Sequence, residues 1–162
     1  MTAIASGLSL APREPAKILV LSGPNLQLLG TREPAVYGTE TLADVHRRLE
    51  VRGHELGFEI DAQQSNHEGV LCDWIGEARG TYDGILLNAG ALTHTSIVLF
   101  DALKGVGVPT IEVHISNPEA REPFRHESKL AGACIGKVCG FGTDSYLLAL
   151  EGLVRWLARR AA

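Results

Sequence analysis

The sequence is poor in the features that mark several common classes of protein. It has three cysteines in 162 residues and no C-x-x-C pair, so neither a disulfide framework nor a zinc ribbon is expected. The 15 Lys and Arg are outnumbered by 19 Asp and Glu, and a net charge of −4 argues against a nucleic-acid partner. No apolar run reaches the roughly 18 residues of a membrane-spanning helix, so no membrane partner is expected. Unpaired thiols are typical of a cytoplasmic protein.

Motifs that mark bound cofactors and metals are also missing. No G-x-G-x-x-G follows the first apolar run, and there is no P-loop, no nucleophile elbow and no H-E-x-x-H. The first apolar run also ends without the acidic cluster of a phosphate-accepting receiver domain. We therefore expect no cofactor and no metal, and a chemistry carried by the protein's own side chains.

The sequence does contain a regular alternation of short apolar runs and amphipathic stretches. The apolar runs predict strands at residues 17–21, 58–62, 84–87, 110–114 and 135–138. Helices are expected between the predicted strands. Two of them have a capping box as start signal, Thr41 with Asp44 and Ser65 with Glu68. A third helix should start at Thr95 or Ser96, and the last helix at Thr143 or Asp144.

Strands that are apolar throughout are typical of a parallel sheet buried on both faces. The predicted fold is therefore α/β: a flavodoxin-like, doubly wound, five-stranded parallel sheet with helices on both faces. Residues 17–162 are assigned to this single domain. Residues 1–16 lack the basic start and long apolar core of a signal peptide, and we interpret them as a flexible N-terminal extension.

Ligands of doubly wound folds bind beyond the carboxyl ends of the strands. The segment between the first strand and the next helix is far longer than the usual stretch of about two to six residues, which favours a binding loop or lid. It carries Asn25, Arg32 and Tyr37. The alternative is an ordinary surface loop in which these side chains are incidental.

The third strand is followed by Asn88 and His94, just before a predicted helix start. Such residues form a polar pocket floor, and the amides of the helix start can receive an anion. The alternative is that Asn88, Thr95 and Ser96 only cap and turn the chain.

The fourth strand places Glu112, His114 and Ser116 on one face. A glutamate in a buried strand is unfavourable unless it is hydrogen-bonded, and a carboxylate beside an imidazole makes the imidazole a better proton carrier. Arg121 and Arg125 follow at a spacing that shares one face of a helix, and they suit a carboxylate or phosphate. The alternatives are a structural Glu and His in the core and a solvated charged turn.

Four segments in this order, GPNLQLLGTREPAVYG, NAGALTHTS, EVHISN and REPFRH, each at a predicted strand end, closely resemble type II 3-dehydroquinate dehydratase. The resemblance runs from Lys17 to Leu157. The sequence departs from the family pattern at Gln27, where the family commonly has Asn, and at Glu127 and Lys129, where it often has His and an aromatic residue. The family assigns chemistry to none of these positions, so the expected activity stands.

The resemblance implies a lyase, a hydro-lyase that converts 3-dehydroquinate to 3-dehydroshikimate. It would eliminate water in the anti sense through an enolate, without a Schiff base, in the shikimate pathway of aromatic amino acid biosynthesis or in quinate catabolism. It also implies a homododecamer, a tetramer of trimers. The competing interpretation is a flavodoxin-like binding module, for a flavin or an acidic metabolite, without catalysis.

The resemblance also implies roles for the catalytic residues. Tyr37, as a phenolate, would take the proton next to the ketone, and Arg32, together with Arg125, would lower its pKa from the usual value of about 10. Asn25 would stabilise the enolate oxygen. His114, oriented by Glu112, would protonate the departing hydroxyl. Among the implied substrate-binding residues, Asn88 and the backbone near Ile115 and Ser116 would bind the substrate carboxylate. His94 and Arg125 would hold the ring hydroxyls, and Arg121 would bind the substrate or support the surroundings of Tyr37. Asp101 would reach the site of a neighbouring subunit.

Overall fold

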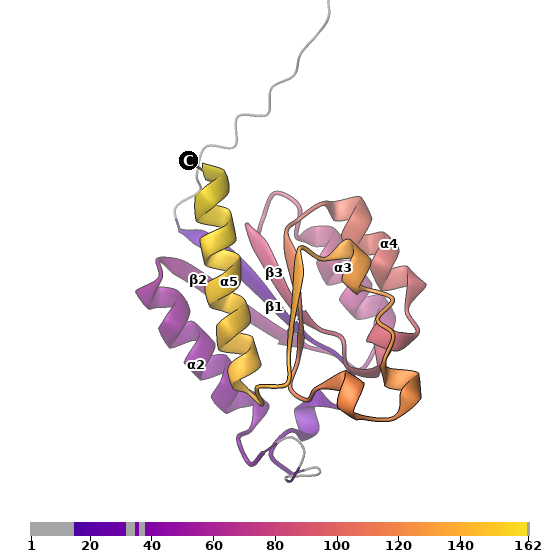
Figure 1. Ribbon diagram of the computed structural model, residues 1–162. Helices are drawn as coiled ribbons and strands as arrows, with labels where there is room; N and C mark the ends of the chain where they lie inside the picture. Colours follow the sequence, from indigo (N-terminus) through magenta and orange to yellow (C-terminus); the bar gives the residue numbers. More distant parts are fainter. Residues whose placement is uncertain (1–14, 32–34, 36–37, 162) are drawn as a thin grey trace, which may run out of the picture.

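A computed structural model describes residues 15–31, 35 and 38–161 of the chain. Five strands pair in parallel in the order β2-β1-β3-β4-β5, the order of a flavodoxin-like doubly wound sheet (Figure 1). The predicted fold class is confirmed, and each predicted strand lies within two residues of an observed one. The strands are β1 (Ala16–Ser22), β2 (Phe58–Gln64), β3 (Gly84–Asn88), β4 (Thr110–His114) and β5 (Gly136–Cys139).

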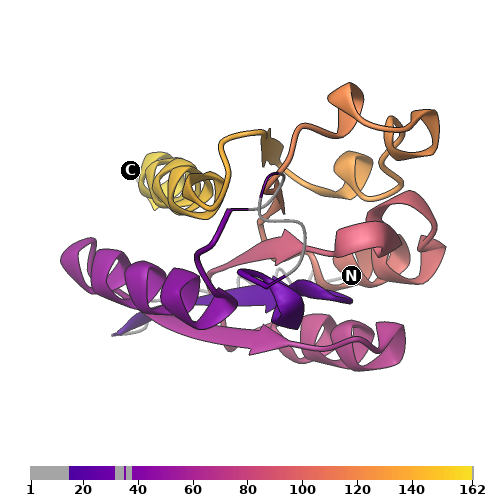
Figure 2. The ribbon, with the colours of Figure 1, turned by 90° about the horizontal axis from the view of Figure 1, so that it is seen from below.

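Among the described residues, four α-helices cover the sheet in two layers, one on each face (Figure 2). The first layer consists of α2 (Leu42–Glu55) and α5 (Asp144–Ala161), and the second of α3 (Glu68–Glu77) and α4 (Ile97–Val106). Alternate residues of a strand therefore enter different cores. On β1, Ile18 packs toward α2 and α5, whereas Leu19 packs toward α3 and α4.

The helix starts follow local hydrogen-bond chemistry. Thr41 Oγ1 accepts from the Asp44 amide at 3.2 Å and Asp44 accepts from the Thr41 amide at 3.0 Å, so the predicted capping box of α2 is confirmed. Ser96 caps α4 through the Leu99 amide at 2.9 Å, and α5 begins at Asp144, as expected.

The second predicted capping box, at Ser65 and Glu68, is wrong. Ser65 Oγ accepts from the amide of His67 at 3.0 Å, two residues along, and this closes a tight turn before the helix. The helix α3 then begins at Glu68, with His67 as its N-cap. A serine hydroxyl can serve a turn or a helix cap, and here the turn takes it.

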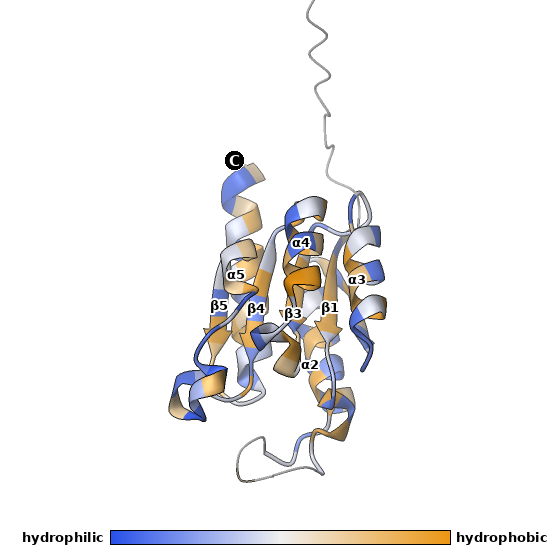
Figure 3. Ribbon diagram, turned by 90° about the vertical axis from the view of Figure 1, so that its right-hand side faces the viewer, coloured by the Kyte–Doolittle hydropathy of each residue, from blue (hydrophilic) through white to orange (hydrophobic). Residues whose placement is uncertain are grey.

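All the strands end at the same side of the molecule, and the loops after β1, β3 and β4 gather there (Figure 3). Two of these loops start from neighbouring strands of the sheet, β3 and β4, which run side by side from Ile85 and Thr110 onward. The parallel topology thus brings distant sequence segments together at one edge of the sheet. In the described part of the chain, no helix combines the length and apolar character needed to cross a membrane.

Candidate active site

A pocket opens beyond the carboxyl ends of β1, β3 and β4, where the fold class predicts ligand binding. Its walls bring together most of the residues predicted from the sequence, namely Asn25, Asn88, His94, His114, Ile115, Ser116, Arg121 and Arg125. Its other lining residues are Pro24, Leu26, Leu28, Leu29, Gly90, Ala91 and Pro118. The pocket therefore combines an apolar wall with converging amides, imidazoles and guanidinium groups.

Of the four remaining predicted site residues, the two that the structure describes, Glu112 and Asp101, do not line this pocket. Glu112 is completely buried behind His114. Asp101 is exposed on α4, and its predicted contribution to a neighbouring subunit stays a prediction. Arg32 and Tyr37 lie outside the described residues, so their predicted roles also stay predictions.

The loops after β1 and β3 approach each other closely at Gly23. The Gly23 amide donates to the Asn88 carbonyl at 2.7 Å, and a Cβ at residue 23 would lie only 2.5 Å from the carbonyl oxygen of Ala89. Only glycine fits this contact. Two residues later, Asn25 has a left-handed φ of 70° and donates its amide to Asn66 Oδ1 at 3.0 Å. The backbone itself thus places Asn25 at the pocket.

Asn88, the last residue of β3, has both ends of its amide held. Its Nδ2 donates to the hydroxyl of Tyr146 at 3.0 Å, and its Oδ1 accepts from the Gly90 amide at 3.2 Å. The Tyr146 hydroxyl also contacts Ser22 Oγ at 3.1 Å. Burial raises the pKa of Tyr146 to about 12, so the hydroxyl stays protonated.

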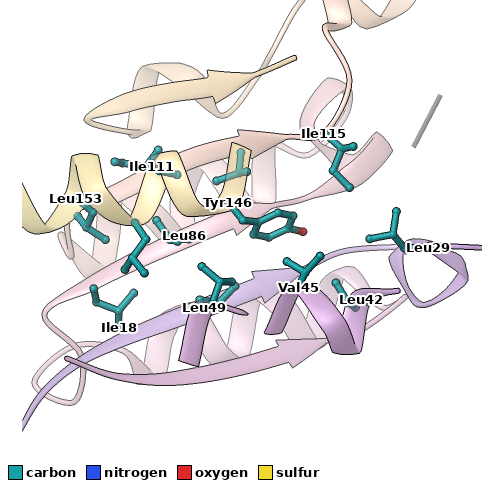
Figure 4. Packing of buried hydrophobic residues seen from close by; sticks show 14 residues of the cluster. Ile18, Leu29, Leu42, Val45, Leu49, Leu86, Ile111, Ile115, Tyr146 and Leu153 are labelled. Atoms are coloured by element: carbon teal, nitrogen blue, oxygen red, sulfur yellow. The ribbon is translucent and has the colours of Figure 1, made fainter. Parts of the chain in front are cut away.

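Sequence reasoning did not find Tyr146 as a residue that supports the site. The residue occupies a core position of the amphipathic pattern of α5, where Figure 4 shows its ring among aliphatic side chains. Its only distinguishing signal was a hydroxyl in an otherwise apolar stripe, which must find a partner when buried.

Glu112 and His114 form the predicted pair on β4. His114 Nε2 lies 2.7 Å from Glu112 Oε1, and the imidazole itself borders the pocket. Burial by itself would raise the pKa of Glu112, but hydrogen bonds from His114, Thr93 and Ser128 outweigh it and hold the pKa below its usual value. The carboxylate is therefore anionic where it meets the imidazole.

Two side chains that hold Glu112 were not predicted as site residues. Thr93 Oγ1 donates to Glu112 Oε1, and Ser128 Oγ lies 2.8 and 2.9 Å from the two carboxylate oxygens. Thr93 belongs to the NAGALTHTS segment and Ser128 follows REPFRH. The signal that could have found them is the glutamate itself, because a buried carboxylate requires several donors.

Arg121 and Arg125 line the pocket, but not from one helix face. Short 3-10 turns, η3 (Pro118–Ala120) and η4 (Pro123–Arg125), replace the helical spacing considered for them. Arg125 Nε donates to Glu122 Oε2 at 2.8 Å, and Arg121 Nη1 donates to Ser116 Oγ at 3.3 Å. Proline at the start of each turn interrupts the regular helix. The two guanidinium groups still make the mouth of the pocket attractive to an anion.

His94 and the three departures from the family pattern each have a hydrogen-bond or ion-pair partner. His94 Nδ1 lies 2.8 Å from the Glu127 carbonyl oxygen and must donate to it, which leaves Nε2 as the acceptor. Glu127 and Lys129 form an ion pair with each other at 2.5 Å, and Gln27 Oε1 accepts from Gln64 at 3.1 Å. The side chain of each departure therefore bonds to a residue that is not one of the predicted site residues.

The fold and pocket define a class of protein: a doubly wound α/β protein with a pocket for a small anion and a buried carboxylate–imidazole pair suited to proton transfer. Within the described part of the chain, no three His, Cys, Asp or Glu residues are grouped so as to hold a metal ion.

Comparison with known proteins narrows this class to one family. Residues 16–154 match the family described as Dehydroquinase class II. A protein of Ralstonia nicotianae named 3-dehydroquinate dehydratase 2 is 61% identical over 142 residues, which cover 85% of this chain and 92% of that protein. A 3-dehydroquinate dehydratase of Rhizobium etli is 55% identical over 136 residues, covering 84% and 94%.

Solved structures agree with this assignment. The crystal structure of a type II dehydroquinase from Butyrivibrio crossotus superposes with a TM-score of 0.83 at 42% identity, covering 85% of this chain and 97% of that one. This chain belongs to the class II dehydroquinase family. Membership disfavours the alternative of a binding module without catalysis.

Proposed function

We propose that this chain is a 3-dehydroquinate dehydratase, a lyase that converts 3-dehydroquinate to 3-dehydroshikimate by eliminating water through an enolate. The observation that carries the proposal is the anionic Glu112 against His114, at the wall of an arginine-bearing pocket, in a chain of the dehydroquinase family. The names of its relatives support the substrate.

His114 is the proposed general acid. Because Nε2 is directed to Glu112, the other ring nitrogen, Nδ1, is the one available to the pocket. A protonated ring gives its Nδ1 proton to the departing hydroxyl, which leaves as water, while the electron pair of the enolate forms the new carbon–carbon double bond. Glu112 stabilises the positive charge of the ring before this transfer.

The proton next to the ketone goes to Tyr37 as a phenolate in this proposal, with Arg32 beside it. Both assignments rest on the resemblance of the GPNLQLLGTREPAVYG segment to the family. Asn25, at the pocket wall, is the proposed group that stabilises the enolate oxygen, directly or through a water.

Substrate binding is assigned to the polar groups that surround this pair. Asn88 and the backbone at Ile115 and Ser116 would hold the carboxylate, and its negative charge suits the guanidinium groups at the pocket mouth. His94 and Arg125 would hold the ring hydroxyls. Arg121 would bind the substrate or support Tyr37.

We also propose the assembly and setting that the family pattern implies. The chain would form a homododecamer, a tetramer of trimers, in which the exposed Asp101 reaches a neighbouring subunit's site. The protein would act in the cytoplasm, in the shikimate pathway or in quinate breakdown. The single domain would comprise residues 17–162, with residues 1–16 as an extension outside it.

The experiment that tests the activity follows the absorbance of the conjugated enone product when purified protein is given 3-dehydroquinate. Product should form without added cofactor, and EDTA should leave the rate unchanged. Borohydride added with substrate should not inactivate the protein, because an enolate route forms no imine with a lysine. Absence of the enone, or inactivation that requires both borohydride and substrate, would contradict the proposal.

A further inference from the structure

The Glu112 carboxylate is enclosed by donors from three separate segments. His114 comes from β4, Thr93 from the turn η2 (Gly90–His94), and Ser128 from the loop after η4. Glu112 has no exposed surface, so these donors take the place of solvent around its charge. The segments are tied together as well, because the Lys129 amide donates to the Thr93 carbonyl at 2.7 Å.

The direction of the Ser128 hydroxyl is fixed by the backbone. Ser128 Oγ accepts from the amides of Leu130 at 3.1 Å and Ala131 at 3.0 Å. A hydroxyl has two acceptor positions and one proton, so both acceptor positions are filled and the proton must be donated. The Glu112 oxygens, at 2.8 and 2.9 Å, are nearer acceptors for it than Thr93 Oγ1 at 3.2 Å. Ser128 is therefore built as a donor to the carboxylate rather than as an acceptor from it.

This arrangement selects one state of the whole cluster. Ser128 has no free acceptor position, so a hydrogen on a Glu112 oxygen that faces it would find no acceptor there, whereas an anionic Glu112 accepts from Thr93, Ser128 and His114 together. His114 then keeps a hydrogen on Nε2, and Nδ1 becomes the nitrogen that exchanges protons with the pocket.

Other ionisable groups lie near the carboxylate or line the same pocket, and among the described residues they include the imidazole of His94. Among the described residues, the thiols of Cys134, ahead of β5, and Cys139, on β5, feel the charge of Glu112. Burial is the main cause that raises the pKa of both thiols, to about 12 for Cys134, so both stay neutral. The guanidinium groups of Arg121 and Arg125 line the same pocket as His114.

We propose that Thr93 and Ser128 are positioning residues for the general acid. They hold Glu112 as an anion in a single orientation, and Glu112 in turn fixes the His114 ring with Nδ1 toward the pocket and stabilises its protonated form. The inference rests on the proposed dehydratase function and adds to it two residues that touch neither substrate nor reacting atoms.

The test compares Thr93→Val and Ser128→Ala with controls that lose a hydroxyl elsewhere in the core. Thr110→Val removes a buried hydroxyl from β4 that bonds only the Val108 carbonyl among the described residues. Ser145→Ala removes a buried hydroxyl that accepts a backbone amide, that of Phe141, as Ser128 does. The controls thus reproduce the structural loss without touching Glu112.

Steady-state kinetics on 3-dehydroquinate give the first readout. Each test variant should lose about tenfold in kcat, the equivalent of one hydrogen bond to a charged group, with KM changed by less than about threefold. The alkaline limb of the pH profile of kcat should also move, because the hydrogen bonds that hold the Glu112 carboxylate against the His114 ring are lost. Thr93→Ser, which keeps the hydroxyl, should restore both values. The controls should keep the wild-type limb.

Nitrogen-15 NMR of the His114 ring gives a second readout that does not depend on turnover. In the wild type the neutral ring should carry its hydrogen on Nε2, and in Thr93→Val and Ser128→Ala the two neutral forms should mix. The inference would be overturned by a wild-type ring that carries its hydrogen on Nδ1. It would also be overturned if the test variants matched their controls both in the alkaline limb of kcat and in the neutral form of the His114 ring. A wild type with the expected ring form but no turnover would instead contradict the proposed function.

Discussion

Replacing Glu112 by glutamine probes the charge of the buried carboxylate with little change in shape. The amide oxygen can take the place of Oε1, which accepts from Thr93 and His114. The amide NH2 then faces Ser128 Oγ, 2.9 Å from Oε2, whose acceptor positions already serve two backbone amides. The variant therefore loses the negative charge beside the imidazole and gains a buried donor without an acceptor.

The size of the effect on kcat follows from the lost charge. A hydrogen bond to a charged group contributes about 1.5–3 kcal/mol, so the protonated imidazole should be destabilised by that amount in Glu112→Gln. Since roughly 1.4 kcal/mol is a factor of ten, kcat should fall about 10- to 100-fold at neutral pH, with partial recovery in more acidic buffer.

The assay is the enone absorbance over a range of pH, with circular dichroism to verify the fold. Glu55→Gln is the matched control, because Glu55 is exposed on α2 and pairs with Arg52 away from the pocket. It should retain the wild-type rate. A kcat for Glu112→Gln within about threefold of the wild type would refute the reasoning that the carboxylate charge sustains the general acid.

Three further substitutions test other parts of the account. Tyr146→Phe leaves the Asn88 amide without its buried partner, so urea unfolding should show a loss of about 1–3 kcal/mol and KM should rise more than kcat falls. Gly23→Ala places a Cβ 2.5 Å from the Ala89 carbonyl oxygen, so it should lower the unfolding free energy by about 1–3 kcal/mol, and wild-type stability would contradict the close approach. Hydrogen bonds from Thr41 are the main cause that lowers the pKa of Asp44 to about 2. The ionised carboxylate therefore stabilises the folded state at pH values above the pKa of an unfolded aspartate, and this stabilisation is lost as the pH falls toward 2. Asp44→Asn should flatten that part of the pH–stability curve, and an unchanged slope would count against the capping box.

The sheet could be predicted from the sequence because its signal is local. The apolar run KILVL needs two covered faces, and the structure buries Ile18 and Leu19 in opposite cores. Such a pattern depends only on neighbouring residues. The capping box predicted at Ser65 was wrong because a serine hydroxyl can close a turn or cap a helix. The local sequence does not decide between these two roles.

The polar edge of the pocket was also predictable, because parallel strands place their carboxyl ends together. Residues such as Asn88 and His114 were located by that rule alone, and both line the pocket. The spacing of Arg121 and Arg125 suggested a helix that the prolines prevent, yet both reach the pocket from short turns.

The supporting residues could not be predicted because their contacts are long-range. Tyr146 is separated from Asn88 by 58 positions and Ser128 from Glu112 by 16, and no local pattern links either pair. The need for such partners was foreseeable, since a buried carboxylate requires donors. Their identity depended on how the loops after β3 and β4 fold over the strand ends.

The central claim is that the imidazole of His114 protonates the departing hydroxyl of 3-dehydroquinate. The measurement that tests it most directly is kcat for His114→Ala by enone absorbance, beside His54→Ala, which removes an exposed imidazole on α2. A general acid contributes on the order of 10²- to 10⁴-fold in rate, so His114→Ala should lose at least about a hundredfold in kcat while His54→Ala keeps the wild-type rate. A His114→Ala enzyme that turns over within about threefold of the wild type would contradict the claim.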